Sequence, residues 1–355
     1  MLIGAEWMLW FARAVSTLSV VRTIRQGTGM HILITGAAGM IGRKLTERLV
    51  IDRALGDQPI DKLTLIDIAA PVRPPGFSDH VKTRAADLAD PGVAEKAISE
   101  RPEVIFHLAG VVSGEAETDF EKGYRVNLDG TRALLETVRH AGGGYKPKFI
   151  FTSSIAVFGA PFPEAIPDEY HLTPLTSYGT QKAICELLLA DYHRRGILDG
   201  VGIRLPTIAV RPGKPNKAAS GFFSGIIREP LSGQDAILPV GDDVMHWHAS
   251  PRAAVGFLLH AASLTREELG SRINLTMPGV CCTVGEQIAA LRRVAGDKVA
   301  ARIRREPDEL VARIVSGWPR RFDARRALSL GFTVEPDFDS IIRVHVEDEL
   351  GGKIA

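Results

Sequence analysis

The chain has 355 residues, with 43 lysines and arginines against 42 aspartates and glutamates. This length exceeds what a single core usually fills, so we expect one large α/β domain with a smaller attached lobe. The balanced charge gives no electrostatic reason to expect a nucleic-acid partner, and it favours a small-molecule ligand. The three cysteines show neither a disulfide framework nor metal-ligand spacing, so we predict a cytoplasmic protein with no metal site.

The first 29 residues differ in composition from the rest of the chain. They begin with an apolar run and continue with arginines. A secretory signal would place basic residues before its apolar run, whereas Glu6 precedes this one. Arg13 then interrupts any stretch long enough to span a bilayer. We therefore predict no membrane segment and treat residues 1–29 as an extension outside the fold, with a transit-like segment as the alternative.

From Met30 onward, short apolar strands alternate with longer amphipathic helices. We expect strands at residues 31–35, 63–67, 81–85, 104–109, 149–152 and 202–205. We expect helices at residues 40–52, 93–100, 120–140 and 177–195. Near-continuous apolar strands that alternate with helices indicate a parallel sheet covered on both faces. The sequence therefore predicts a doubly wound α/β domain of the Rossmann type at residues 30–205.

Beyond Leu205 the alternation of strands and helices fades. A stretch containing proline and glycine leads to separate helical patterns at residues 252–263 and 284–294. This part has too few strand patterns for a second dinucleotide-binding fold. Ligands of open α/β sheets bind at the carboxyl ends of the strands, so we expect residues 206–355 to form mainly a substrate-binding lobe over that edge.

A glycine-rich turn follows the first strand directly and leads into a helix. Gly36, Gly39 and Gly42 form a G-x-x-G-x-x-G pattern. The first glycine permits a tight turn, the second lets a pyrophosphate approach the backbone, and the third allows the helix to pack closely. The N-terminus of that helix favours a negatively charged ligand. We therefore expect these glycines, with Met40 and Ile41 between them, to bind a dinucleotide cofactor.

An acidic residue ends the second predicted strand. Asp67 lies 25 residues after Gly42, where a carboxylate can accept hydrogen bonds from the adenosine ribose hydroxyls. It would also repel a 2′-phosphate, so the sequence predicts NAD rather than NADP as the cofactor. The alternative is that Asp67 only caps a strand end or a helix. Arg73 is the nearby basic residue that would favour NADP, but it lies beyond a proline.

Tyr178 and Lys182 lie four residues apart at the start of a predicted helix, so their side chains share one face. An ammonium beside a phenol favours the phenolate and lowers the tyrosine pKa from its usual value of about 10. Such a tyrosine can take the proton of a substrate hydroxyl while hydride leaves the same carbon for a nicotinamide. A surface pair on a helix is the ordinary alternative, because this spacing is common.

A second motif precedes this pair. Residues 151–159 read Phe-Thr-Ser-Ser-Ile-Ala-Val-Phe-Gly and bring hydroxyls to a strand end. With this motif, the chain from Met30 to about Gly331 resembles the extended short-chain dehydrogenase/reductase superfamily, which includes nucleotide-sugar epimerases and dehydratases. Further segments that match the superfamily are 87–88, 107–110 and 127–131.

This resemblance implies roles for individual residues. Tyr178 would be the catalytic base, Lys182 its activator and an anchor for the nicotinamide ribose, and Ser154 the hydroxyl that orients the substrate oxygen. Ser153 remains the alternative serine. Asn127 would hold the active-site helix, or would merely satisfy buried backbone groups. Besides Tyr178 and Lys182, the further cofactor contacts that the resemblance implies are Asp87, Leu88, Leu108, Ala109, Gly110, Asn127 and Pro206.

Three cations gather in the loop that follows the last predicted strand of the sheet. Residues 211–217 read Arg-Pro-Gly-Lys-Pro-Asn-Lys and lead into Ala-Ala-Ser-Gly-Phe-Phe at 218–223. With Ser113, this run resembles the D-erythronate dehydrogenase branch of the superfamily, whose members oxidise the carbon-2 hydroxyl of a four-carbon sugar acid. An arginine offers a bidentate fork for a carboxylate, although these cations could simply be solvated. The substrate contacts implied are Ser113, Ser154, Tyr178, Thr207, Arg211 and Lys214.

Two alternative functions remain open. A nucleotide-sugar epimerase or dehydratase would hold NAD tightly, but residues 246–252 lack the acidic pair common in epimerase relatives. A non-catalytic NAD-binding module is the other alternative, although all the catalytic residue types are present. His246 and His248 have no third ligand at suitable spacing, so we expect structural or rim histidines rather than a metal site. The resemblance also implies a homodimer that pairs through the helices at 120–140 and 177–195.

Overall fold

The computed structural model describes residues 29–213 and 220–354. The extension predicted at residues 1–29 therefore lies outside the described residues, except for Gly29. Within them, the central feature is an eight-stranded sheet with the order β4-β3-β1-β5-β6-β8-β12, in which neighbouring strands run parallel and β2 (Ala54–Leu55) adds an antiparallel hairpin to β3. The parallel strands are β1 (Met30–Thr35), β3 (Gln58–Asp67), β4 (Val81–Ala85), β5 (Val104–His107), β6 (Lys148–Ser154), β8 (Asp199–Leu205) and β12 (Asn274–Thr276).

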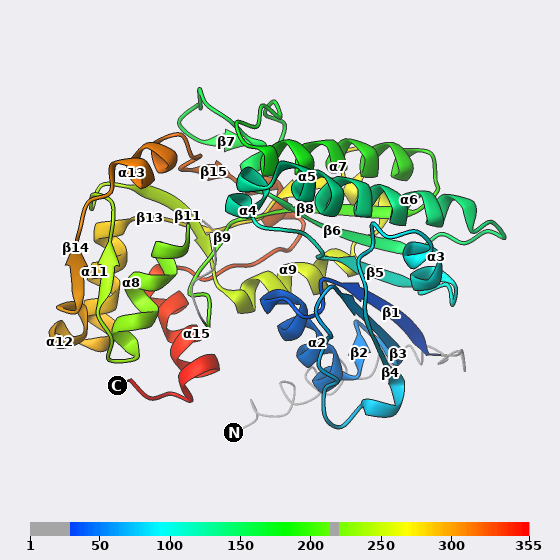
Figure 1. The fold of residues 1–355 in the computed structure, drawn as a ribbon, viewed down its shortest axis with the longest axis horizontal. Coiled ribbons are helices and arrows are strands. Elements are labelled where there is room, and N and C mark those ends of the chain that lie inside the picture. The colour runs from blue at the N-terminus through cyan, green and yellow to red at the C-terminus, as the bar shows by residue number, and fades with distance from the viewer. Residues whose placement is uncertain (1–28, 214–219, 355) are drawn as a thin grey trace, which may run out of the picture.

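Helices cover both faces of this sheet, as Figure 1 shows. The central strands are apolar on both faces, and Ile32, Leu33 and Ile34 of β1 are fully buried. Such strands need a helix layer on each side. One layer contains α2 (Met40–Asp52) and α9 (Pro251–Ser263), and the opposite layer contains α3 (Val93–Ile98), α6 (Gly130–His140) and α7 (Ser177–Arg194).

The strand order reverses beside β1. Its neighbours are β3 on one side and β5 on the other, so the connections from β1 and β5 leave toward opposite faces of the sheet. The turn after β1 is tied to β3, because the backbone N–H of Gly36 donates to the carbonyl of Ile66. The first residue after β5, Leu108, donates its N–H to Thr35 of β1. A crevice therefore opens outside the carboxyl ends of β1 and β5, which is where such sheets bind ligands.

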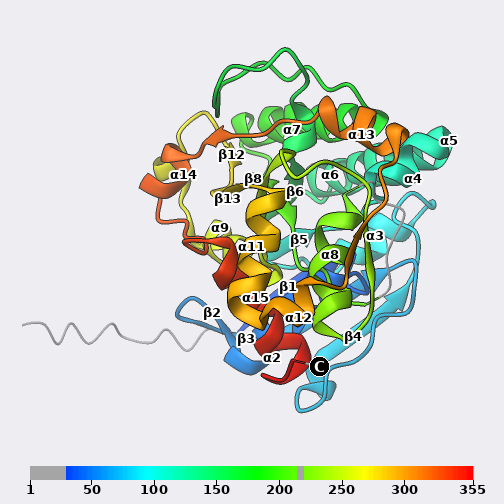
Figure 2. The same cartoon turned by 90° about the vertical axis from the view of Figure 1, so that its left-hand side faces the viewer.

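A separate lobe stands beside the carboxyl edge of the sheet, and Figure 2 looks onto it. It has its own core, in which Phe223, Leu291 and Ile341 are fully buried. Helices α11 and α15 pack against each other in this core. The strands of the lobe are β9 (Thr207–Ile208), β10 (Ala236–Leu238), β11 (Met245–Ala249), β13 (Val280–Thr283) and β14 (Ile303–Arg305). Its helices are α8 (Gly221–Leu231), α11 (Val284–Ala295), α12 (Asp297–Ala300), α13 (Glu309–Ser316) and α15 (Phe338–Leu350).

Shorter elements complete the described chain. Two helical pieces, α4 and α5, lead into the helix layer next to α7. Strands β7 and β15 pair with each other near the carboxyl edge. These elements are α4 (Ser113–Thr118), α5 (Phe120–Gly123), the 3₁₀ turn η3 (Ile155–Val157), β7 (Ile166–Pro167), α10 (Arg266–Leu269), β15 (Phe322–Asp323) and α14 (Arg325–Ser329).

The predicted doubly wound α/β fold is confirmed, and all six predicted strands are present within a few residues of their expected ends. The expected helix at 120–140 is one helical run, but its middle is a π-helix, η2 (Tyr124–Asp129). Strand β12 has no counterpart among the predicted strands. It lies in the part assigned mainly to the lobe, yet it pairs with β8, so the domain boundary at 205 stays a prediction and the sheet extends beyond it.

Candidate active site

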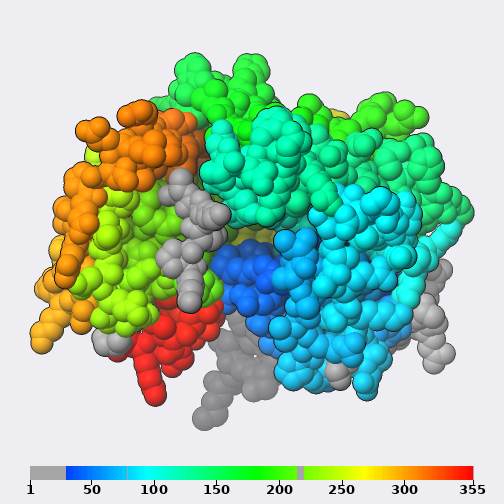
Figure 3. Space-filling view, viewed as in Figure 1, coloured from blue at the N-terminus to red at the C-terminus, as the bar shows by residue number. Residues whose placement is uncertain are grey.

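A cavity of about 790 Å³ lies between the carboxyl edge of the sheet and the lobe. Figure 3 shows these two parts side by side, with the early sheet elements in blue and cyan and the lobe in lime to red. The cavity brings together residues from the glycine-rich turn, β6, α7 and the lobe. The predicted site residues that line it are Gly36, Gly39, Met40, Ile41, Gly42, Leu108, Gly110, Ser113, Ser154, Tyr178, Lys182, Pro206, Thr207 and Arg211.

Five predicted cofactor residues are not among the residues that line the cavity. Leu88 is buried, and the N–H of Ala109 donates to the Thr35 hydroxyl at 3.4 Å. The Asp87 carboxylate lies 3.2 Å from the guanidinium of Arg125 on η2. Asp67 and Asn127, described below, are the other two. Lys214, predicted as a substrate contact, lies outside the described residues.

The glycine-rich turn has the geometry of an anion cradle. Gly36 has a φ of 75°, and a Cβ atom there would lie 2.6 Å from the backbone of Leu108 and Ala109. A Cβ atom on Gly42 would lie 2.2 Å from the carbonyl oxygen of Gly36, so the helix can pack this closely only with glycine. Gly39 is the N-cap of α2 and gives no side-chain cap to the first-turn N–H groups. Those groups face the cavity, where they can bind an anion.

The Asp67 carboxylate is anchored at the end of β3. One oxygen accepts from the N–H of Ala38 in the glycine-rich turn at 2.9 Å, and the other accepts from Ala69 at 3.2 Å. The side chain is partly exposed, so each oxygen retains lone pairs for a further donor. The carboxylate therefore stabilises the turn, which agrees with a structural role, and its free lone pairs leave the predicted ribose contact as a prediction.

Asn127 connects the loop after β5 to α7, the helix that contains Tyr178 and Lys182. It is 1% exposed and lies in the π-helix η2. Its side-chain oxygen accepts from the N–H of Val111 at 2.9 Å, and its nitrogen donates to the side-chain oxygen of Gln181 at 2.7 Å. Gln181 precedes Lys182 on α7. The asparagine thus satisfies a buried backbone group and holds the helix, which are the two roles that the sequence left open.

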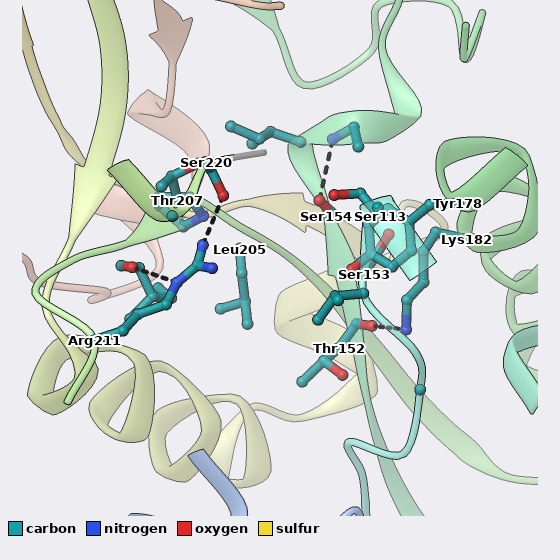
Figure 4. A pocket seen from close by; sticks show the side chains of 18 of the residues that line it. Ser113, Thr152, Ser153, Ser154, Tyr178, Lys182, Leu205, Thr207, Arg211 and Ser220 are labelled. Carbon is teal, nitrogen blue, oxygen red and sulfur yellow. Dashed lines mark hydrogen bonds between the residues drawn. The ribbon is translucent and has the colours of Figure 1, made fainter. Parts of the chain in front are cut away.

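The two serines at the end of β6 make different contacts. The buried Ser153 hydroxyl donates to Glu186 at 2.5 Å. Glu186 in turn binds Arg204 of β8 at 2.8 Å, and both of these side chains are buried. Both serines line the cavity, but the Ser154 hydroxyl is not tied to a buried carboxylate, and it accepts from the N–H of Ala156 at 3.2 Å. Figure 4 shows Ser154 beside Tyr178. Of the two serines, the geometry favours Ser154 as the one that meets a substrate.

Burial raises the pKa of the Tyr178 phenol, while the hydrogen bond from Ser154 and the positive charge of Arg211 oppose that rise. The lowered pKa that the sequence predicted from pairing with Lys182 is therefore wrong for this geometry. The reason is that the ammonium turns away from the phenol oxygen. It lies 5.8 Å from the centre of the Tyr178 ring and donates to the carbonyl of Thr152 at 2.9 Å.

Lys182 itself is 4% exposed, and burial lowers its pKa to about 8. The nearby Cys185 and Glu186 oppose this shift. The ammonium lies 4.8 Å from the ring centre of Phe151, a favourable cation–π distance. Among the described residues, the Thr152 carbonyl is the one hydrogen-bond acceptor of this buried ammonium, so the ammonium is suited to bind a hydroxyl of a ligand at the cavity wall.

Arg211 lies on the opposite wall, which the lobe provides (Figure 4). Its Nε donates to the carbonyl of Ile208 at 2.9 Å and its Nη2 donates to Ser220 at 2.9 Å. The backbone N–H of Arg211 donates to Ser224 at 3.0 Å, and Arg228 donates to its carbonyl at 2.7 Å. Burial lowers the pKa of Arg211, but a guanidinium keeps its charge at any working pH. The cavity therefore has a fixed cation facing Tyr178.

A line of hydrogen bonds runs behind Thr207 on the same wall. The Thr207 hydroxyl lies 2.7 Å from Nε2 of His246, and Nδ1 of His246 lies 3.1 Å from the carbonyl oxygen of Pro319. The neighbouring His248 lies 2.7 Å from the side-chain nitrogen of Gln287. Both histidines are buried, as expected for structural residues. His246, however, also lines the cavity.

A model of the NAD dependent epimerase/dehydratase family matches residues 32–262. The chain belongs to this family. Proteins that are similar over most of the chain include two named D-erythronate dehydrogenase. One, from Cupriavidus necator, is 50% identical over 90% of this chain and 98% of its own length. The other, from Haemophilus influenzae, is 41% identical over 90% of this chain and its whole length.

Solved structures are similar to the chain over most of its length. A protein from Agrobacterium tumefaciens described as a nucleoside-diphosphate-sugar epimerase is 65% identical, with a TM-score of 0.90, over 92% of this chain and 96% of that one. An L-threonine dehydrogenase from Cupriavidus necator has a TM-score of 0.77 over 90% of this chain and 99% of that one. At 21% identity, it shows a shared fold alone.

Several cavity residues of this family member were missed by sequence reasoning. Ser220, Ser224 and Arg228 all line the cavity, and all three bind Arg211. Their spacing of four residues puts them on one face of α8, which is otherwise largely apolar. This spacing of polar residues in an apolar helix could have been used to predict that they line a polar site. Glu117 was also missed. It lines the cavity and accepts from the N–H of Ser177 at the start of α7.

Among the described residues, no group of three or more His, Cys, Asp or Glu side chains is placed to hold a metal ion. In the same part of the chain, no helix is both long and apolar enough to cross a membrane.

Proposed function

We propose that this chain oxidises the carbon-2 hydroxyl of D-erythronate, with NAD as the hydride acceptor. One observation carries the proposal: a fixed guanidinium, Arg211, faces Tyr178 and Ser154 across a single cavity. The two relatives named D-erythronate dehydrogenase, which match 90% of the chain, support the same substrate. A sugar acid has a carboxylate that can bind the Arg211 guanidinium and hydroxyls that can bind the polar side chains of the cavity.

The residues around the glycine-rich turn fit NAD. The first-turn N–H groups of α2 and the close approach at Gly36 and Gly42 suit a pyrophosphate. The Asp67 carboxylate would bind the adenosine ribose hydroxyls, and its charge would disfavour a 2′-phosphate. Lys182 would bind the nicotinamide ribose. When bound, the nicotinamide supplies a hydride acceptor.

The proton of the substrate hydroxyl would pass to Tyr178. The Ser154 hydroxyl, which lies beside Tyr178 (Figure 4), would bind the same substrate oxygen and hold it in line. The positive charge of Arg211 favours loss of the phenol proton, because it stabilises the phenolate. It acts against the burial that raises the Tyr178 pKa.

Arg211 would fix the carboxylate of the acid. Its contacts with Ile208 and Ser220 hold the planar group in place before a ligand arrives. A preorganised cation orients the substrate at little entropic cost, so carbon 2 is presented to the nicotinamide face. Ser113 and Thr207 would bind the hydroxyls, and Lys214 is a further candidate contact.

The test is NADH formation from purified protein with D-erythronate, other aldonic acids and UDP-sugars, followed by absorbance. We expect turnover with D-erythronate and none with UDP-sugars. The second candidate, a nucleotide-sugar epimerase, is favoured by the description of the Agrobacterium tumefaciens structure. It predicts the reverse result: a UDP-hexose is epimerised without net NADH, and every acid is inert. Tight NAD binding without turnover of either class would support a non-catalytic module.

We also propose a homodimer in the cytoplasm. Phe120 on α5 and Leu187 on α7 are 56% and 65% exposed, on the helices that the resemblance implicates in pairing. Large exposed side chains on neighbouring helices suit an interface between two copies. The three cysteines are all described and all free, which suits a reducing compartment. Light scattering of the purified protein would give its mass, and Leu187→Glu should shift a dimer toward monomer.

A further inference from the structure

The hydrogen bonds behind Thr207 have a defined direction. The carbonyl oxygen of Pro319 can only accept, so Nδ1 of His246 carries the hydrogen and donates to it. In a neutral imidazole the other nitrogen, Nε2, is then an acceptor. The Thr207 hydroxyl, 2.7 Å away, must donate its hydrogen to that nitrogen. The hydrogen of Thr207 is therefore committed to the protein interior, and its remaining lone pairs can accept a hydrogen bond from the cavity.

The ring of His246 is held in this orientation by its packing. It stacks on Phe223 with a centroid distance of 5.1 Å and an interplanar angle of 2°, and Trp318 packs against it at 5.4 Å. His246 is 3% exposed. Burial lowers its pKa to about 4, with the neighbouring Arg211 acting in the same direction, so the ring stays neutral and its Nε2 stays an acceptor.

Thr207 lies on the cavity wall, so its oxygen is placed to accept a hydrogen bond from a ligand. In Figure 4, Thr207 lies on the same wall as Arg211, across from Tyr178 and Ser154. The wall that donates hydrogen bonds to the acid therefore also contains one oxygen restricted to accepting. A carboxylate oxygen cannot donate to it, whereas a hydroxyl can.

We infer that His246 is a specificity-determining positioning residue, which holds the Thr207 oxygen as an acceptor for a substrate hydroxyl that is not oxidised. This inference rests on the proposed oxidation of a sugar acid. Arg211 and Tyr178 define two points of the substrate, and the Thr207 oxygen adds a third. Three points fix which face of carbon 2 meets the nicotinamide. A site built to bind a hydroxyl also rejects an analogue that lacks it, because the protein acceptor then loses its partner.

The first arm of the experiment compares D-erythronate with its 3-deoxy and 4-deoxy analogues, by kcat/KM with saturating NAD. We expect the wild type to prefer D-erythronate over at least one analogue by about 10- to 100-fold. Thr207→Val keeps the shape of the side chain and should reduce that preference to about threefold or less. Thr207→Ser keeps the hydroxyl and should retain the preference. Equal preference in wild type and Thr207→Val would overturn the inference.

The second arm tests His246 with a matched pair of variants. His246→Gln can place an acceptor near the position of Nε2, whereas His246→Asn reaches only the position of Nδ1 and leaves Thr207 without its acceptor. We expect His246→Gln to retain most of the preference for D-erythronate and His246→Asn to lose it. A purely structural role would lower turnover of all three acids in parallel in both variants, and that result would refute the inference. Melting temperatures and NAD affinity check that each variant is folded.

Failure of the inference can be told apart from failure of the proposed function. If wild type oxidises D-erythronate but no variant changes the preference, the inference alone fails. If wild type oxidises none of the acids, the proposed function fails, and the inference fails with it.

Discussion

Ser153 and Ser154 are neighbours at the end of β6, yet their hydroxyls bind different partners: Ser153 donates to the buried Glu186, and Ser154 accepts from the N–H of Ala156 and lies beside Tyr178 at the cavity (Figure 4). Alanine at the two positions should therefore have different effects. Ser154→Ala should lower kcat by roughly 100-fold with little change in stability, because it removes a group that orients the reacting oxygen. Ser153→Ala should leave kcat within about threefold but lower the free energy of unfolding by about 1–3 kcal/mol, because the Glu186 carboxylate loses a buried partner. Urea unfolding and steady-state kinetics on both variants decide this, and the reverse pattern would make Ser153 the catalytic serine.

Tyr178→Phe should abolish oxidation while NAD still binds. The change removes the proton acceptor but keeps the ring that lines the cavity. We expect a loss of kcat of about 100-fold or more, as for removal of a general base. Turnover and a fluorescence titration with NADH measure the two properties separately. Near-normal turnover in this variant would exclude Tyr178 as the base.

Asp67 should determine the choice between NAD and NADP. Asp67→Asn removes the negative charge but keeps an oxygen that can accept from the turn, whereas Asp67→Ala removes both acceptors of the Ala38 and Ala69 N–H groups. We expect both variants to reduce the preference for NAD over NADP. Only Asp67→Ala should also lower the affinity for both cofactors, because it loosens the turn. Values of kcat/KM for the two cofactors are the measurement. If wild type uses NADP as well as NAD, Asp67 has a structural role alone.

Arg211→Ala should lower kcat/KM for D-erythronate by about 100-fold, the equivalent of about 3 kcal/mol, with NAD affinity nearly unchanged. Arg211→Lys should recover less than about tenfold, because an ammonium cannot bind Ile208, Ser220 and a carboxylate in one plane. Erythronamide is the control substrate. It lacks the negative charge, so its turnover should depend much less on Arg211. Equal losses for the acid and the amide would argue against a carboxylate at this position.

His107 should make the protein less stable in acid. It is buried between the hydroxyls of Thr35 and Thr131, at 2.7 and 2.8 Å, and burial lowers its pKa to about 3. Between pH 6.5 and about 3 the unfolded chain binds a proton that the folded protein excludes, so the free energy of unfolding falls as the pH falls through this window. His107→Gln removes that titration. From pH 7 to pH 5 the variant should lose about 2 kcal/mol less than wild type in urea unfolding. Parallel losses would mean that His107 does not remain neutral.

Most strands of the sheet could be predicted from the sequence, because each strand pattern lies within a few consecutive residues. The apolar runs at β1, β5 and β6 and the helix period of α2 and α7 are each readable within a short window. Strand β12 could not be found in this way. It has only three residues, and its place beside β8 is set by packing of α14 and by the Thr276 N–H, which donates to Asp168 over a separation of 108 residues.

The same distinction between local and distant information applies to the candidate site residues. Gly36, Tyr178 and Lys182 belong to compact motifs, so their meeting at one cavity could be anticipated. The pKa of Tyr178 could not, because it depends on burial by the lobe and on where the ammonium of Lys182 points. The role of His246 depends on Pro319, 73 residues further along the chain. No spacing rule brings those two residues together.

Strand β12 also means that the chain forms the lobe in two parts, one on each side of a sheet strand. After β8 the chain builds β9, α8, β10 and β11 of the lobe, returns to the sheet to pair Leu275 with Ile203, and then builds the rest of the lobe from β13 to α15. A fragment ending at Leu205 would lose that pairing and the α9 cover, and it would expose a fully buried strand as an open edge. Open apolar edges recruit other chains and aggregate. The cofactor-binding half is therefore not a module that can be excised, transplanted or expressed alone, and recombination between relatives would have to exchange β12 and α9 together with it.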